Sequence, residues 1–508
     1  MTLVWREILF RSHRCAAETD NDEKMKSSLL SGMGAPDRSN DDAGPRFSGG
    51  SLIALGISNT IGAGIFVLTG IVAAHNAGPA VVLAYALAGV ACLCTGLCYA
   101  ELAAMCSAAG SAYTYALVAV GELAAWVIGW DLILEFLVSG ATVAVGWSGY
   151  LLGLLGSVGI TVPRALTEGP LKLGAHHQLV LHPSWGNVPA MVLIGIQAVL
   201  LLLGVRQTRT FINIAVSVLI GIIVLTIIAA GSLANASNLK PFIPDNLGEF
   251  GRFGFSGVFT GAAIVFFSYT GFEAVSTATR EVRNPARDLP IGLLGSLGVC
   301  ASLYILASLA MVGITRYQTL DTAEPVVTAL QAGGSTLSWL IPIVRAGIVV
   351  GLSAASMGSM YAQTRILHAM AADGLLPESL SGLHPTRHTP TLATIAVGLS
   401  AIFIAGVFPL EVLGELVSIG TLFAFTSVCV SVLILRYRDN TRPRPFRAPG
   451  LIVAAPAGIG INVALMLSLP RVTWLRFLIW MTVGIVFYIV YRRRRLVAAS
   501  RTEVSPRA

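Results

Sequence analysis

Apolar residues occupy long runs of the chain, and short polar segments separate one run from the next. Between residues 50 and 491 the runs are about 18–25 residues long, the length that an α-helix needs to cross a hydrocarbon layer of about 30 Å. The pattern predicts twelve membrane-spanning helices, at residues 50–73, 79–105, 122–156, 188–204, 210–233, 254–279, 289–315, 340–368, 390–408, 411–436, 450–469 and 474–491.

The composition supports the same fold class. Hydrophobic residues make up 55% of the chain and charged residues only 12%, whereas about a quarter of the residues of a soluble domain are charged. We therefore expect an all-α integral membrane protein surrounded by membrane lipid, and the composition excludes a soluble fold.

The formal net charge of +7 does not point to nucleic acid, because the basic residues are distributed by loop. Arginine-rich loops alternate with loops that hold few basic residues, and the rich loops contain residues 206–209, 280–287, 436–447 and 492–495. Basic loops stay on the cytoplasmic side of a membrane. The pattern predicts a multi-pass protein of the plasma (inner) membrane, with an even number of spans and both termini in the cytoplasm.

The two ends of the chain differ from the apolar middle. Residues 1–47 mix charges of both signs with Ser, Asn, Gly and Pro, which is typical of a disordered tail. The first long apolar run begins near Ser51, so we expect no signal peptide. Residues 492–508 are predicted to form a basic cytoplasmic tail that anchors the last span at the membrane surface.

Cysteine and histidine give little reason to expect a metal or a cofactor. Six of the seven cysteines fall in or at the ends of apolar runs, where cysteine packs as a small hydrophobic residue. A metal held by Cys92, Cys94 and Cys98, or by His176, His177 and His182 in the loop 157–187, is the weaker alternative. We find no zinc-ligand motif, no Gly-x-Ser-x-Gly elbow and no Walker loop, so we expect neither an enzyme nor an ATP-driven pump.

Two predicted spans carry glycine at mid-membrane depth. The first contains Gly62-x-Gly64, and the sixth contains Gly271 followed by an ionisable residue, Glu273. Non-helical backbone within a membrane must face a cavity or protein, because unpaired N–H and C=O groups cost several kcal/mol each. If both spans break here, N–H groups after Gly62 would attract a carboxylate. Carbonyls before Thr270 would accept hydrogen bonds from an ammonium group.

An α-amino acid presents a carboxylate and an ammonium group side by side. The breaks lie five spans apart, as expected of a five-plus-five inverted repeat with its site at the repeat interface. The competing interpretation of Gly62-x-Gly64 is close packing of helices, and it lacks the third glycine of a dinucleotide fingerprint.

Several segments carry a family resemblance, and they occur in the expected order over roughly residues 50–450. They are SNTIGAGIFVLTG (58–70), YAELAAMCSAAGSAYTYA (99–116), GELAAWVIGWDLILEF (121–136), AVGWSGYL (144–151), FFSYTGFEAVSTATREVRNPARDLPIG (266–292), RILHAMAADGLLP (365–377) and HPTRHTP (384–390). The chain resembles the cationic amino acid transporter family of the amino acid–polyamine–organocation superfamily.

The resemblance implies a LeuT-type fold with two inverted repeats and two additional helices. The repeats would be residues 50–233 and 254–436, and the additional helices would lie within 450–491. It also implies a substrate site made of Ile61, Gly62, Ala63 and Gly64, which would bind the carboxylate through N–H groups, and of Phe267, Ser268, Thr270, Gly271 and Phe272. In this second set Phe267, Ser268 and Thr270 would supply carbonyls to the ammonium group, Phe267 matches an aromatic gate, and Phe272 would line the side-chain pocket.

Two positions depart from the family pattern. Typical members carry Asp where this chain has Glu273, which keeps the acidity. Proton-coupled relatives place a lysine on the fifth span where this chain has Leu219, which puts lysine-based proton coupling in doubt. Gating or coupling candidates are therefore Glu273, Glu135 on the third span, and Ser353 and Ser356 on the eighth. Asp131 lies one turn from Glu135 on the same face of its helix.

We predict an amino acid permease that works by alternating access. Cationic substrates (arginine, lysine or ornithine) and small neutral L-amino acids both stay open, as do uniport, proton symport and exchange. The alternative is an amino-acid sensor or receptor on the same fold without net transport, against which the short C-terminal tail speaks. The resemblance predicts an amino acid as partner, with protons as an open second partner.

Overall fold

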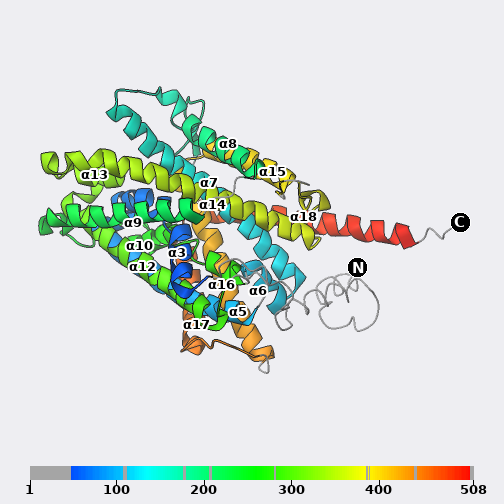
Figure 1. Cartoon of the computed structure of the whole chain (residues 1–508). Coiled ribbons are helices and arrows are strands. Elements are labelled where there is room, and N and C mark those ends of the chain that lie inside the picture. The colour runs from blue at the N-terminus through cyan, green and yellow to red at the C-terminus, as the bar shows by residue number, and fades with distance from the viewer. Residues whose placement is uncertain are drawn as a thin grey trace.

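A computed structural model of the chain describes residues 47–503, apart from residues 107–110, 175–178, 205–208, 280–281, 385–386, 388 and 440–442. Nearly all of the predicted N-terminal tail lies outside the described residues, as do His176 and His177. The rest is almost entirely helical, and Figure 1 shows its helices gathered into one bundle.

Each of the twelve predicted spans corresponds to a helix or to a broken helix. The unbroken spans are α5 (Val81–Met105), α7 (Glu122–Ser157), α8 (Val188–Leu202), α9 (Arg209–Ser232), α12 (Pro285–Ile314), α14 (Ile341–Ala372), α15 (Thr391–Val407), α16 (Leu410–Arg438), α17 (Leu451–Ser468) and α18 (Arg471–Glu503). The first span is divided into α3 (Gly49–Thr60), η1 (Gly64–Leu68), α4 (Thr69–Val72), η2 (Ala73–Ala77) and η3 (Gly78–Ala80). The sixth is divided into α10 (Gly254–Val265), η6 (Phe266–Tyr269) and α11 (Ala274–Thr277).

Length and hydropathy agree with a membrane protein. Within the described residues nine helical stretches are long and apolar enough to cross a membrane, and one of them, Gly64–Met105, joins the second half of the first span to α5. The helices α8 and α15 are apolar but shorter. The all-α membrane fold is therefore confirmed.

Two groups of helices dominate the packing. Helix α12 packs most extensively on α5 and α3, and α10 also packs on α5. In the second group α14 packs on α7, and α15 packs on α8 and α7; Figure 1 shows α8 and α15 side by side. The two broken spans belong to the first group, and α7 contacts the first of them through Val143 and Tyr150.

Several short elements escaped prediction. Between the second and third spans lies α6 (Ala112–Ala119), whose first turn is capped by the side chain of Ser111. The loop predicted at 157–187 contains the antiparallel hairpin β1 (Leu171–Leu173) and β2 (Leu179–Leu181). Helix α13 (Pro325–Gln331) lies between α12 and α14. Short helices of this length are not marked by a long apolar run, so hydropathy alone does not reveal them.

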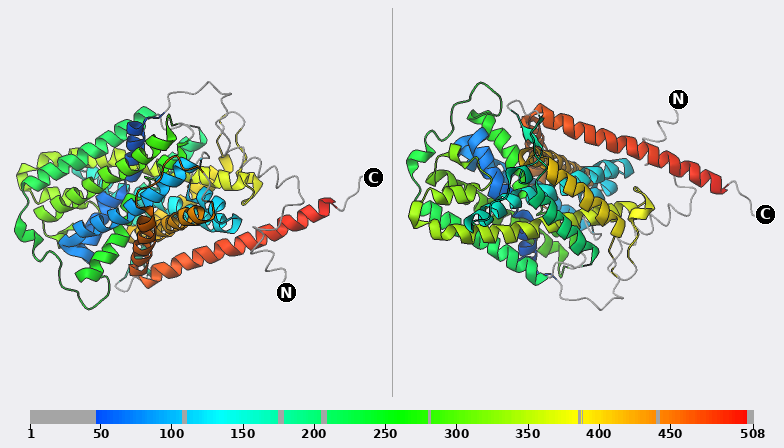
Figure 2. Two further views of the ribbon diagram at one scale, coloured as in Figure 1. Left: turned by 90° about the horizontal axis from the view of Figure 1, so that it is seen from below. Right: turned by 90° about the horizontal axis from the view of Figure 1, so that it is seen from above.

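The last helix is longer than predicted and is bound tightly to α7. Helix α18 continues past residue 491 to Glu503, and Figure 2 shows this part projecting beyond the bundle. The indole N–H of Trp130 donates to the carbonyl of Trp480 at 3.0 Å, and the indole N–H of Trp480 donates to the carbonyl of Trp130 at 3.1 Å. Trp126 adds a third bond of 3.0 Å to the carbonyl of Gly484.

Candidate functional site

The first and sixth spans break where the glycines predicted it. Helix α3 ends at Thr60, Ile61 is extended (φ −77°, ψ 106°), and the chain resumes at Gly64 as a π-helix, η1, before α4 begins at Thr69. In the sixth span η6 ends at Tyr269, Thr270 is extended (φ −64°, ψ 144°), and Gly271 adopts φ +108°. Glycine suits this last position because other residues rarely adopt so positive a φ. Both predicted breaks are confirmed.

The two breaks lie against each other. A Cβ atom added to Gly64 would lie 2.2 Å from Ser268 Oγ and 2.6 Å from Ser268 Cα. A Cβ atom added to Gly271 would lie 2.2 Å from the carbonyl oxygen of Asn59. Each glycine therefore lets the backbone of one span approach the backbone of the other, a second reason for glycine besides conformational freedom.

Polar backbone groups gather at this contact. The N–H groups of Gly62, Ala63 and Gly64 lie at the start of a helix, where N–H groups lack carbonyl partners within the helix and the helix dipole favours an anion. The N–H of Ile61 differs, because it donates to the carbonyl of Ile57 at 3.0 Å. On the sixth span the carbonyl of Phe267 accepts two bonds from Thr270, from its N–H at 3.2 Å and from its hydroxyl at 2.8 Å.

Glu273 closes the second break from within its own span. Its two carboxylate oxygens accept the N–H of Gly271, at 2.9 and 3.1 Å. Its carbonyl accepts the Ser276 hydroxyl at 2.6 Å. The side chain therefore binds an N–H of the break itself and places a carboxyl group beside the broken backbone.

Tyrosine hydroxyls from three other helices reach the first break, and no pattern in the sequence predicts them. Tyr304 on α12 donates to the carbonyl of Thr60 at 3.0 Å, and Tyr150 on α7 donates to the carbonyl of Phe66 at 2.6 Å. Tyr85 on α5 lies 3.3 Å from the carbonyl of Gly64, 3.3 Å from Ser268 Oγ and 2.7 Å from Thr69 Oγ1. They therefore bond to carbonyls at the break and in the π-helix that follows it, from helices outside the first span.

A family model for amino acid permeases matches residues 47–491. The chain belongs to the amino acid permease family. It is 40% identical over 444 residues to a branched-chain amino acid permease, BcaP, of Bacillus subtilis (strain 168), with 87% of this chain and 92% of the relative covered. It is also 40% identical, over 443 residues and the same shares of both chains, to the methylthioribose transporter of that strain.

Cationic amino acid transporters are similar over the same core. The permease is 38% identical over 393 residues to the vacuolar cationic amino acid transporter 4 of Arabidopsis thaliana, covering 77% of this chain and 63% of the relative. It is 35% identical over 399 residues to cationic amino acid transporter 4 of Homo sapiens. The predicted resemblance is thereby confirmed, and the permease is a multi-pass membrane protein of amino acid transport.

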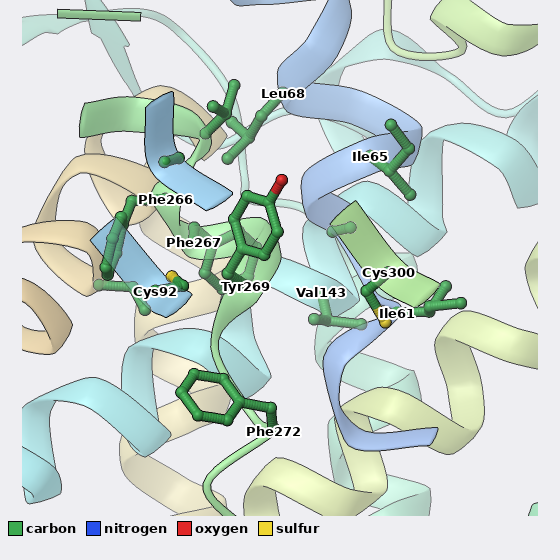
Figure 3. Close-up of a cluster of buried hydrophobic side chains, with 14 of the residues drawn as sticks. Ile61, Ile65, Leu68, Cys92, Val143, Phe266, Phe267, Tyr269, Phe272 and Cys300 are labelled. Atoms are coloured by element: carbon green, nitrogen blue, oxygen red, sulfur yellow. The ribbon is translucent and has the colours of Figure 1, made fainter. Parts of the chain in front are cut away.

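Apolar side chains surround the two breaks of the permease. Figure 3 shows Ile61, Val143, Phe267 and Tyr269 in one buried cluster. Val143 on α7 is the side chain nearest to Gly62, 3.8 Å from the position of an added Cβ. Phe272 is fully buried, and its ring packs edge-on against Tyr99 and Phe425 at centroid distances of 5.9 and 5.4 Å.

Glu135, a candidate for coupling, lies on α7, close enough to Glu273 of the second break for the two carboxyl groups to interact electrostatically. Its side chain is buried beside Gly420, and so is that of Asp131, whose Oδ1 lies 3.0 Å from an added Cβ at Gly420. Neither oxygen of Asp131 and only one oxygen of Glu135 has a hydrogen-bond partner among the described residues.

The two candidate serines of α14 face α7 and α8 instead. Ser356 lies 3.0 Å from the amide oxygen of Gln197 and 3.2 Å from the carbonyl of Gly140. The carbonyl of Ser353 accepts the Gln197 amide at 3.0 Å, and its hydroxyl donates to the carbonyl of Val349 at 2.8 Å. Both serines hold α14 against its neighbours in this conformation.

Leu219, at the position where the resemblance led us to expect a lysine in proton-coupled members, is buried on α9. A Cβ added to Gly351 of α14 would lie 2.2 Å from the Leu219 side chain, so leucine fills the space between α9 and α14. Within the described part of the chain no group of three His, Cys, Asp or Glu side chains could hold a metal ion.

An ion pair closes the loop that carries α13. Arg345 on α14 binds Glu324 through two nitrogens, at 2.7 and 3.1 Å. Burial raises the pKa of the Glu324 carboxyl, and the hydrogen bond from Arg345 partly offsets this. Glu324 also lies against Gly153, where an added Cβ would be 2.1 Å from its Oε1. The pair therefore fastens this loop to both α7 and α14.

Proposed function

We propose that this permease moves neutral aliphatic L-amino acids across the membrane by alternating access, with the substrate bound between the two helix breaks. The observation that carries the proposal is the contact of the breaks at Gly64 and Ser268. Two five-helix repeats, residues 50–233 and 254–436, with residues 450–491 added, would place this contact at the repeat interface. Transport without catalysis accords with relatives that are permeases and transporters.

The arrangement of polar groups suits both charges of an amino acid. The N–H groups of Gly62, Ala63 and Gly64 would donate to the carboxylate at the positive end of the resumed helix. Ser268 Oγ and the carbonyls of Phe267, Ser268 and Thr270 would accept from the ammonium group. The carbonyl of Phe267 already accepts both the N–H and the hydroxyl of Thr270, so it would contribute least to binding the ammonium group.

A neutral aliphatic side chain is favoured over a cationic one. The side chains of Ile61, Val143 and Phe267 beside the breaks are apolar. Glu324 is paired with Arg345 and Glu273 accepts the N–H of Gly271, so both acids are engaged. The branched-chain permease of Bacillus subtilis supports this class. Cationic amino acids and methylthioribose, which other relatives carry by name, are the competing substrates.

Proton linkage through Glu273, with Glu135 as the second acid, is our proposal for coupling. Glu273 touches the broken backbone directly, so its charge would respond to movement of the sixth span. Because residue 219 is leucine, the proposal does not involve a lysine on α9. Uniport and exchange are the competing modes. Gating by Ser353 and Ser356 would require that their bonds to Gln197 and Gly140 change during transport.

We further propose that the permease lies in the plasma membrane with both termini in the cytoplasm. The alternation of arginine-rich loops supports this orientation. Reporter domains fused at each end, one active only in the cytoplasm and one only outside, test it. Activity of the outside reporter at either end would contradict the orientation.

Transport is tested with purified permease in liposomes and radiolabelled L-leucine, L-arginine and methylthioribose, with empty liposomes as control. We expect saturable leucine uptake that excess unlabelled leucine abolishes and an inward proton gradient increases. Equal final levels with and without the gradient would replace symport by uniport. Uptake of arginine or methylthioribose in place of leucine would overturn the substrate class, and binding without flux would favour the sensor.

A further inference from the structure

Three N–H groups of the first break lie between two peptide groups that tyrosines hold. The peptide that joins Thr60 to Ile61 precedes them, and its carbonyl accepts the Tyr304 hydroxyl at 3.0 Å. The peptide that joins Gly64 to Ile65 follows them, and its carbonyl lies 3.3 Å from the Tyr85 hydroxyl. Both tyrosine side chains are fully buried, so water does not compete for these bonds.

The donor in each hydrogen bond around Tyr85 can be assigned from the contacts. Thr69 donates its one hydroxyl hydrogen to the carbonyl of Ile65 at 2.7 Å, so the 2.7 Å contact of Thr69 with Tyr85 must be a donation by Tyr85. Tyr85 then offers the carbonyl of Gly64 only a weaker share of that hydrogen. Its oxygen accepts from Ser268 at 3.3 Å.

This order links the two breaks. The chain Ser268 to Tyr85 to Thr69 to Ile65 runs from the sixth span to the first, and every hydroxyl in it is buried. Because Ser268 gives its hydrogen to Tyr85, its oxygen faces a ligand only as an acceptor. An acceptor is what an ammonium group requires.

We propose that Tyr304 and Tyr85 are positioning residues for the substrate carboxylate. They orient the peptides on either side of Gly62, Ala63 and Gly64, Tyr304 through a full hydrogen bond and Tyr85 through a weaker, shared one, so that the three N–H groups converge on one point. Without them the extended backbone at Ile61 would be free to turn its neighbours away, since the cost of a wrong peptide orientation is small where no helix is present. The inference rests on the proposed substrate site and adds to it residues from α12 and α5.

The Tyr304→Phe variant tests this role, because it removes one oxygen and keeps the ring. In liposomes, inhibition of labelled leucine uptake is compared for L-leucine and L-leucinol, which keeps the ammonium group and side chain but lacks the carboxylate. We expect wild type to prefer leucine, and the variant to lose between about twofold and tenfold of that preference. Loss of folded protein would lower uptake without changing the ratio of the two inhibition constants.

Tyr85→Phe should lower affinity for both compounds, because Ser268 loses its acceptor as well. Tyr113→Phe is the matched control: its buried hydroxyl bonds Asp373 at 2.8 Å, outside the breaks, and the ratio should equal that of wild type. An unchanged ratio in Tyr304→Phe overturns the positioning role. No preference for leucine in wild type overturns the carboxylate site itself, which distinguishes the two failures. If another amino acid proves to be the substrate, that amino acid and its amino alcohol replace leucine and leucinol.

Discussion

The two broken spans satisfy their irregular backbone in different ways. At the first break the carbonyls of Thr60, Gly64 and Phe66 face tyrosines from α12, α5 and α7. At the sixth span most of the bonds are local: Thr270 donates to Phe267, and Gly271 donates to Glu273. One comes from another helix, since Ser418 of α16 donates to the carbonyl of Ile264 at 3.0 Å. The first break therefore depends mainly on the packing of distant helices, and the second is encoded mainly in the seven residues 267–273.

This difference has a physical cause. The first break contains Ile61, Gly62, Ala63 and Gly64, none of which has a polar side chain to donate or accept. The second contains Thr270 and Glu273, whose short-range bonds compete successfully with helix. The backbone of a break without polar side chains needs hydrogen-bond partners from elsewhere, and within a membrane these come from other helices.

The largest expected effect comes from blocking the contact between the breaks. Gly64→Val should reduce uptake to background while the protein still inserts, because the added Cβ would overlap the backbone of Ser268. Gly50→Val is the control, since nothing lies within 4 Å of a Cβ at Gly50. Uptake and detergent-solubilised yield of both variants are measured together. Normal uptake by Gly64→Val would remove the site from this position.

Two substitutions of Glu273 distinguish its role as hydrogen-bond acceptor from the role of its charge. Glu273→Ala should lower uptake by about tenfold or more, because the N–H of Gly271 loses its acceptor in a buried place. Glu273→Gln keeps an acceptor, so we expect uptake within severalfold of wild type but an altered dependence of uptake or exchange on pH. Rates measured from pH 5 to 8 decide it: a wild-type profile in Glu273→Gln excludes this carboxylate from coupling.

Thr270→Val should have a smaller effect. It removes the hydroxyl bond to Phe267 and leaves the N–H bond to the same carbonyl. We expect KM for leucine to rise about twofold to fivefold with little change in Tm. A greater loss than in Tyr304→Phe would show that the second break is the more fragile one and would reverse the comparison.

The smallest expected effect comes from Asp373, outside both breaks, and serves as a control for the pH experiments. Burial raises the pKa of Asp373 above its usual 3.8, and the hydrogen bond from Tyr113 partly offsets the shift. A raised pKa in the folded protein means that stability is fully present below the usual pKa and is lost as pH rises through the folded pKa. In Asp373→Asn the fall of Tm with rising pH should be smaller than in wild type, by about 2 °C or less. A larger flattening would show that stability contributes to the uptake profiles.

Much of the fold follows from hydropathy, and the helix breaks follow from glycine. Twelve apolar runs predict the spans, and Gly62, Gly64 and Gly271 predict where two of them break. Short elements such as α6 and α13 were missed, because neither is long enough to leave a hydropathy signal.

The side chains around the breaks were harder to predict. Tyr85 and Tyr304 reach backbone that lies 21 and 244 positions away in sequence, and any buried tyrosine in an apolar run looks the same in a single sequence. Glu324 and Arg345 are likewise joined only by the fold. Roles for Glu135, Ser353 and Ser356 stay predictions, and the two serines bond to α7 and α8 instead of to the breaks.

The paired indole bonds between α7 and α18 have a practical consequence. Two helices that each donate to the other's backbone cannot slide or rotate relative to each other without breaking both bonds at once. The projecting end of α18 continues the helix that these bonds attach to α7 (Figure 2). A fiducial protein inserted in helical register there would inherit the orientation of α7, which would help electron microscopy align particles of so small a membrane protein. A fluorophore at the same place would report rotation of α7 from outside the bundle.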